Sequence, residues 1–345
     1  MTVCYVHLEI KRIQTYLFSV PKLKAMVGAN VILGETTMGT KDDLEFKGKP
    51  EDAQNLVQLA VANGGLSPIS SISKETKDLF SNSDLEDDAP LEFAEKGIVS
   101  RHGGHFSAFF TTKEKADEFE SAARMMITEK LPGAMVKCDI FDDKQMEEKL
   151  KERKKSDEDN KQDGNKGLKY KNDNPAFVQT LAEIPQFVLC EGSGNEPASE
   201  NKMSASYLEK EKAANKHYDS FNTKDIVGML YNKDVNLPRG SKRDCSFEDI
   251  AQKKYLAVIH ADGNNMGKLS SEWARYNITM NLENINEAEI LPTFINNELI
   301  REAFFYSMRK ATRKAIVSSV MSTFHTKPER YRLFMAGGDD LLLVC

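Results

Sequence analysis

The chain has 345 residues and carries 47 basic and 53 acidic side chains, so its formal net charge at neutral pH is −6. A chain of this length can form two domains, each with its own hydrophobic core. The net negative charge excludes a protein that attracts nucleic acid through an overall positive field. Any contact with nucleic acid therefore needs a local basic patch or a partner.

Alternating and periodic patterns define a first unit near the start of the chain. A strand is predicted over Val3–Ile10, and IQTYLFSVPKLKAMVGANVILGE then predicts helices interrupted near Pro21. Two apolar runs around a Gly-Gly pair predict a hairpin over Ile98–Phe110. An amphipathic helix over Lys113–Lys130 and a strand over Ala134–Phe141 follow. Strand, helix, hairpin, helix, strand is the ferredoxin-like order.

The middle of the chain differs in composition. Residues 142–174 are rich in charge and poor in apolar side chains, so we expect a flexible arm there. Beyond Pro175 a short apolar run reaches FVLCEGSGNEPAS, and a mostly helical region then extends to about Leu230. We therefore divide the chain into a first unit over 1–141, a flexible and helical linker region over 142–250 and a second unit over 251–345.

The second unit contains the most distinctive motifs. Residues Lys253–Leu269, KKYLAVIHADGNNMGKL, predict a buried strand, a sharp Asp-Gly turn and the start of a helix. A longer helix is predicted over about 300–324. The segment MAGGDDLLLV at 335–344 predicts a hairpin, because paired glycines supply the positive φ of a tight turn. Asp339 and Asp340 follow these glycines directly.

The two units are expected to repeat one fold. YVHLE at Tyr5–Glu9 aligns with AVIHAD at Ala257–Asp262, and RHGGHFSAFF aligns with MAGGDDLLLV. The predicted fold class is therefore α+β, with two ferredoxin-like units and a helical linker region. The first hairpin carries His105 where the second carries an acid, so we expect the first unit to support the second structurally.

Three acids are expected to converge in the second unit. The first strand of a ferredoxin-like unit lies beside the hairpin, so Asp262 should approach Asp339 and Asp340. Converging carboxylates repel each other unless cations bind, and oxygen ligands suit Mg²⁺ or Mn²⁺. Two such ions can neutralise a triphosphate and activate a hydroxyl for in-line attack, with the carbonyl of Gly263 as a further ligand. The alternative is a solvated hairpin with an acidic tip.

These motifs together resemble a known family. HADGNNMG followed by GGDD, a preceding Gly-Gly hairpin without acids, and the opening IQTYLF…GANVILGE are similar to the large polymerase-like subunit of type III CRISPR effector complexes. The resemblance implies palm units like those of nucleotide cyclases and GGDEF-type enzymes. It further implies that ATP is joined into cyclic oligoadenylate messengers when the complex binds target RNA, with the other subunits and the guide RNA as partners.

The resemblance also implies roles for individual residues. Asp262, Asp339 and Asp340 would be catalytic metal ligands. The basic run RKATRK over Arg309–Lys314 is typical of a solvated helix face, although with a neighbouring lysine it could contact phosphates. The residues expected to contact the nucleotide are Gly337, Gly338, Gly263, Asn30 and Lys268.

The sequence departs from the family pattern in several places. It starts directly in the palm strand without a nuclease domain, so we expect no DNA cleavage by this chain. Only Cys190 remains of the family's four-cysteine module, so we expect no zinc. Asn264 stands where a further acid is common. The sequence stops at Cys345, inside the second unit, so we expect a fragment of a longer protein or completion by another chain.

Cysteine usage and the absence of export signals indicate the compartment. The five cysteines lie far apart and form no CxxC pair, which favours reduced thiols over a disulfide framework. No signal peptide or long apolar span is present, so we expect a cytoplasmic protein without a membrane partner.

The sequence leaves alternative functions open. The chain could be a catalytically silent palm that scaffolds an RNA-guided complex, although its intact acids argue against this. It could also be a signalling cyclase using GTP, or an enzyme that transfers AMP to another small molecule. The sequence leaves the product undecided between cyclic and linear oligoadenylates and an AMP conjugate. His7 and His260, at strand ends, are expected to pack or to form hydrogen bonds rather than to catalyse.

Overall fold

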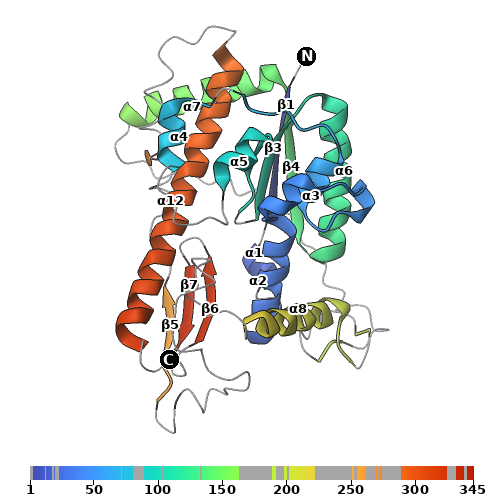
Figure 1. Ribbon diagram of the computed structural model, residues 1–345, viewed down its shortest axis with the longest axis vertical. Helices are drawn as coiled ribbons and strands as arrows, with labels where there is room; N and C mark the ends of the chain where they lie inside the picture. The colour runs from blue at the N-terminus through green and yellow to red at the C-terminus, as the bar shows by residue number, and fades with distance from the viewer. Residues whose placement is uncertain are drawn as a thin grey trace.

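The computed structural model contains two antiparallel sheets, with one long helix running beside both (Figure 1). Within the described part of the chain, no helix is both apolar enough and long enough to cross a lipid bilayer. The structure describes residues 3–11, 13–17, 19, 23–70, 72–80, 89–102, 104–132, 134–162, 189–191, 198–199, 202–221, 251, 255–261, 269, 272–273, 289–324, 332–337 and 340–345.

The first sheet has four strands in the order β2-β3-β1-β4, and each neighbouring pair is antiparallel. The turn between β2 and β3 contains Gly104 with a φ of +77°, a conformation that glycine adopts without strain. The predicted order of strand, helix, hairpin, helix and strand is confirmed for this part of the chain. The strands are β1 (Cys4–Lys11), β2 (Ile98–Ser100), β3 (His105–Phe110) and β4 (Met135–Phe141).

Three helices, α2 (Leu23–Thr37), α3 (Leu56–Ala62) and α6 (Lys113–Lys130), contribute side chains to the core on one face of this sheet. Alternation along β1 directs every second side chain into this core, as expected for a strand with period two. Asn55 caps α3 by accepting a hydrogen bond from the backbone N–H of Gln58. The buried residues that β1 and β3 contribute to this core are Cys4, Val6, Leu8, Ile10, Phe106, Ala108 and Phe110.

The opposite face of the first sheet packs against the long helix α12 (Ile290–Phe324). The Phe294 side chain is fully buried, and its ring centroid lies 5.1 Å from that of Tyr5 on β1 and 6.4 Å from that of Phe109 on β3. Two short helices complete this second core, α4 (Lys74–Phe80) and α5 (Pro90–Glu95).

The second sheet has the strand order β5-β7-β6 and is also antiparallel. Its strands are β5 (Val258–Ala261), β6 (Arg332–Gly337) and β7 (Asp340–Val344). This order matches β1-β3-β2 of the first sheet, and α12 lies between β5 and β6 in the chain as α2 lies between β1 and β2. The strands that the sequence aligned therefore occupy corresponding places.

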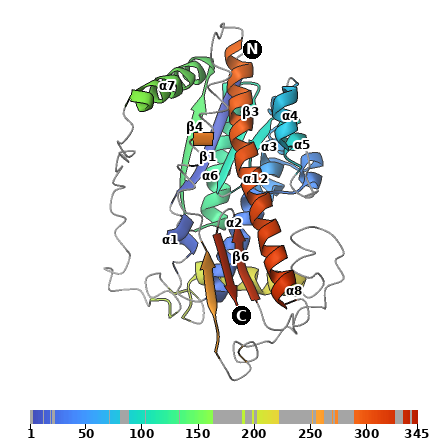
Figure 2. The same cartoon turned by 90° about the vertical axis from the view of Figure 1, so that its left-hand side faces the viewer.

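Helix α12 extends along both sheets, as Figures 1 and 2 show. Its 35 residues correspond to a length of about 52 Å at the usual helical rise. It contacts β2 of the first sheet and β6 of the second. The sequence predicted a helix over about 300–324, whereas the structure begins it at Ile290, with Pro292 in the first turn, where a proline is tolerated.

The prediction of a flexible arm is wrong for residues 143–162. These residues form helix α7 (Asp143–Gln162), in which the Met146 and Leu150 side chains are buried. The two apolar residues are four apart, so they share one face of the helix and join the core beneath α12. Most residues of this segment are charged, so the composition gave no indication that Met146 and Leu150 would be buried. The remainder of the predicted arm, 163–174, lies outside the described residues.

Helix α8 (Ala205–Phe221) packs very closely across α2. A Cβ atom placed on Gly28 of α2 would lie 1.7 Å from the backbone oxygen of Lys210. The Lys210 side chain is buried, and its Nζ donates to the carbonyl of Tyr16 at 3.0 Å and to Oγ of Ser19 at 2.7 Å. The remaining elements are α1 (Ile13–Leu17) and the short 3₁₀ helices η1 (Lys41–Glu45) and η2 (Pro50–Asp52).

We expect Gly28→Ala to destabilise the protein although alanine favours helices. The new methyl would meet the backbone of α8, and overpacking of this kind costs about 1 to 3 kcal/mol. Gly34→Ala is the matched control on the same helix, because its Cβ would have only an ordinary contact with Met38. The control should gain about 0.5 to 1 kcal/mol in urea unfolding. Equal stabilisation by both changes would show that α8 does not pack on Gly28.

Candidate functional site

The acidic segment of the second sheet forms the predicted hairpin of two paired strands. Strand β6 ends at Gly337, strand β7 begins at Asp340, and these two residues pair with each other. Gly338 and Asp339, which connect the strands, lie outside the described residues. Asp340 therefore opens a strand directly after a two-residue connection, the loop length most common in hairpins.

Strand β5 lies beside β7, which is the pairing that the sequence predicted. Ala261, the last residue of β5, is opposite Leu341 near the start of β7. Asp262 follows Ala261 along the chain, and Asp340 precedes Leu341. Three of the predicted site residues, Asp262, Gly263 and Lys268, lie outside the described residues.

Asn30 lies on a helix that contacts the second sheet. It is a half-buried residue of α2, and α2 contacts β6, the strand that leads into the acidic hairpin. That Asn30 lines a nucleotide pocket stays a prediction.

The basic run on α12 is not uniformly solvated. Arg309 is only 7% exposed and donates to Oε1 of Glu302 at 2.9 Å in a buried ion pair. The interpretation of this run as a solvated face is therefore wrong for Arg309. Lys314, in contrast, is exposed.

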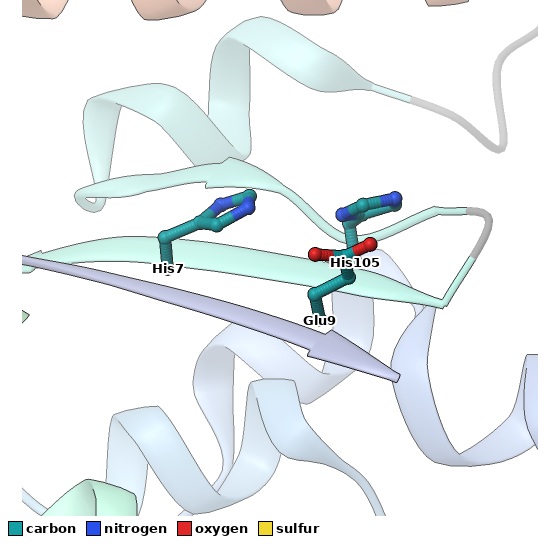
Figure 3. A group of neighbouring side chains, drawn as sticks. All are labelled: His7, Glu9 and His105. Atoms are coloured by element: carbon teal, nitrogen blue, oxygen red, sulfur yellow. The ribbon is translucent and has the colours of Figure 1, made fainter. Parts of the chain in front are cut away.

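A second group of polar side chains lies on the first sheet, at the place that corresponds to the acids of the second. His7 and Glu9 project from β1 and His105 from β3, all on the same side of the sheet (Figure 3). Glu9 and His105 are direct partners across the two strands. One ligand atom from each of the three residues lies within 4.8 Å of the other two, which is close enough to share a metal ion.

The environment keeps both imidazoles neutral. Burial lowers the pKa of His7 to about 4, with the carboxylate of Glu298 acting in the opposite direction. Burial likewise lowers the pKa of His105, and Glu9 opposes this shift. Neutral imidazole carries a free nitrogen lone pair, which is the form that accepts hydrogen bonds and binds metals.

His7 should make the protein less stable in mild acid. Its folded pKa lies below the ordinary value of 6.5, so the unfolded chain binds the proton first as the pH falls. The stability that neutral His7 provides is complete above pH 6.5 and is lost progressively towards pH 4, by about 3 kcal/mol at most. Urea unfolding in EDTA should therefore show a smaller loss between pH 7 and pH 4 for His7→Gln than for the wild type. Parallel pH profiles would contradict this prediction.

Sequence reasoning missed the His-Glu-His group because it treated the residues singly. The signal was present in His-x-Glu, since side chains two apart on a strand share a face. The third member depends on the pairing of Glu9 with His105, which joins residues far apart in the sequence. Such a register cannot be deduced from local patterns.

Comparison with protein-family models and with curated proteins gave no match to this chain. Any proposal about function is therefore based on the residues themselves and on their geometry.

Proposed function

We propose that the chain is a metal-dependent nucleotidyltransferase that uses ATP and acts as the polymerase-like subunit of a type III CRISPR effector complex. The pairing of Ala261 with Leu341 is the observation that supports this most. Asp262 follows Ala261 in the sequence and Asp340 precedes Leu341, and consecutive Cα atoms are only about 3.8 Å apart, so the pairing supports a shared position for the two acids. We infer from this that two acids distant in sequence belong to one site.

The arrangement of both sheets supports two palm units. Antiparallel order β2-β3-β1-β4 with helices after β1 and β3 is that of a ferredoxin-like unit, and β5-β7-β6 has the same order for its three strands. In both, the central hairpin strand lies beside the first strand of the unit. The acids lie on the second unit, so the first acts as its support.

The donor set suits Mg²⁺ or Mn²⁺, because carboxylate oxygens are the ligands that hard cations prefer. Such ions, when bound, neutralise a triphosphate and activate an attacking hydroxyl. Strand β7 holds the backbone of Asp340 in an extended, paired conformation, which fixes where its carboxylate begins. Gly337 and Gly338 leave room for phosphates, and Asn30 orients the nucleotide from α2. Lys268 adds positive charge near the triphosphate.

The proposed partners are those that the resemblance implies, namely the other subunits of the complex with guide and target RNA. With a formal net charge of −6, the chain lacks a general positive field for RNA, which is compatible with RNA being held by those other subunits. Target binding then switches on synthesis of a cyclic oligoadenylate-type messenger in the cytoplasm.

The complex containing this chain should be incubated with labelled ATP and Mg²⁺ or Mn²⁺, with and without target RNA, and its products analysed by mass spectrometry. We expect oligoadenylates that depend on both metal and target RNA. Unconsumed ATP would indicate a silent scaffold, and a product made only from GTP would indicate a signalling cyclase. An AMP conjugate would still indicate nucleotidyl transfer, but to a different acceptor molecule.

A further inference from the structure

The first sheet contains a buried nitrogen that needs a partner. Nδ1 of His7 is shielded from solvent and has no hydrogen-bond partner among the described residues. A buried polar atom without a partner costs roughly 1 to 3 kcal/mol, so proteins seldom retain one without a reason. A bound ion is one such reason.

Two further donor groups lie next to His7. Its ring centroid is 5.6 Å from that of His105, and the two rings are inclined by only 28°. Glu9 lies two residues after His7 on β1 and directly opposite His105 on β3 (Figure 3). The strand pairing therefore holds all three Cα positions and leaves only side-chain rotation to adjust the ligand atoms.

We infer that His7, Glu9 and His105 form a binding site for a divalent transition metal ion of the zinc type. Two imidazole nitrogens and one carboxylate oxygen are a known ligand set for Zn²⁺, with water in the fourth position. Ligands at 2.0 to 2.1 Å around a tetrahedral ion lie roughly 3.4 Å apart. Closing the group from within 4.8 Å to that spacing requires small rotations of three half-buried side chains.

The charges around the group favour a cation, and Lys11 is the side chain that competes with a metal ion for Glu9. Lys11 Nζ lies 2.5 Å from Glu9 Oε2, but this lysine is 45% exposed and can turn into solvent when a metal binds. Helix α12 places Glu298 and Glu302 over the same face. Glu298 accepts a hydrogen bond from the Tyr5 hydroxyl at 2.9 Å, and Glu302 is paired with Arg309. Glu9 is thus the carboxylate that supplies the metal-binding oxygen.

This site differs in chemistry from the acids of the second unit. The aligned positions of the second unit are His260, Asp262 and Asp339, so the repeat has exchanged a carboxylate for an imidazole. Imidazole ligands favour Zn²⁺, Cu²⁺, Fe²⁺ or Ni²⁺ over Mg²⁺. The sequence predicted no zinc because a cysteine module is incomplete, whereas this site uses no cysteine. It also does not depend on nucleotidyl transfer.

The test uses the full chain with Asp339→Asn and Asp340→Asn, which removes the other predicted metal site. After stripping with EDTA, Zn²⁺ binding is measured by calorimetry and Co²⁺ binding by its visible absorption. We expect one ion per chain and a rise in melting temperature on loading. Glu9→Gln and His105→Gln should each weaken binding at least about tenfold. Losing a hydrogen-bond partner of a metal ligand already costs about that much affinity, so losing a ligand itself should cost no less. His102→Gln, on the same hairpin, should bind as the parent chain does.

Several results would overturn the inference. Equal affinity in all four proteins, or no binding to the parent chain, would exclude the site. A Co²⁺ spectrum dominated by thiolate charge transfer would place the ion on cysteines instead. Far-ultraviolet circular dichroism without metal checks the fold of each variant, and Glu9→Gln keeps the size of the side chain. A folded Glu9→Gln variant that still binds tightly is therefore sufficient to reject it.

Discussion

Replacing both Asp339 and Asp340 with alanine should abolish nucleotide product while the protein still folds. Metal ions at such a site contribute several kcal/mol of transition-state stabilisation, so turnover should fall by at least about 100-fold to 1,000-fold. Adjacent carboxylates repel each other, so their loss should leave the free energy of unfolding without metal unchanged or slightly higher. ATP turnover and urea unfolding measured on the same preparation check both parts.

The chain offers a matched acidic pair as a control. Asp117 and Glu118 are adjacent and exposed on α6, on the first unit. Their double replacement with alanine removes the same charge and should change stability by no more than about 0.5 kcal/mol per site and leave turnover intact. Unchanged turnover in the Asp339 and Asp340 double variant would remove these acids from the mechanism.

Phe294→Ala should be the most destabilising single truncation that we predict. The side chain is fully buried between Tyr5 and Phe109, and it anchors α12 to the first sheet. Loss of a buried phenylalanine costs about 3 to 5 kcal/mol, because apolar burial is lost and a cavity remains. The urea midpoint should fall accordingly, with far-ultraviolet circular dichroism reporting on the whole chain.

Phe305→Ala on the same helix provides the comparison. This side chain is 41% exposed and its ring contacts Phe304, so its removal should cost about 1 kcal/mol or less. Similar losses for the two variants would mean that α12 is not held to the first sheet through Phe294.

Local patterns were sufficient to predict much of the first unit. Alternation along Val3–Ile10 and the Gly-Gly pair in Ile98–Phe110 indicated strands that the structure has, and the periodic segment Lys113–Lys130 is α6 with the predicted bounds. In each of these elements, the apolar residues recur with the period of a strand or a helix. The periodicity of the apolar residues therefore predicts which side chains will be buried.

Tertiary contacts explain what could not be predicted. Only two apolar residues, Met146 and Leu150, hold α7 to the core, and the other residues of this 20-residue helix are polar and mostly charged. Helix α12 meets two different sheets along its length, so its apolar residues do not follow a single stripe. For each element, the burial depends on a partner far away in the sequence.

The candidate functional residues also divide into those predictable from local motifs and those that depend on tertiary contacts. The acids Asp262, Asp339 and Asp340 are evident from motifs, and the pairing of β5 with β7 accords with the expected topology. The His7, Glu9 and His105 group has no motif of its own. It exists only because two strands pair in one register, and a shift of one residue would turn a member to the other face.

The length of α12 has a consequence for communication between the two sheets. A continuous helix curves only gently, so a displacement of the end that carries Phe294 would be passed on to the end beside β6 and its acidic hairpin. Ligands bound to the two sheets would then share one coupling free energy. Such coupling is reciprocal: whatever factor a ligand on the first sheet imposes on affinity at the hairpin, a ligand at the hairpin imposes in return.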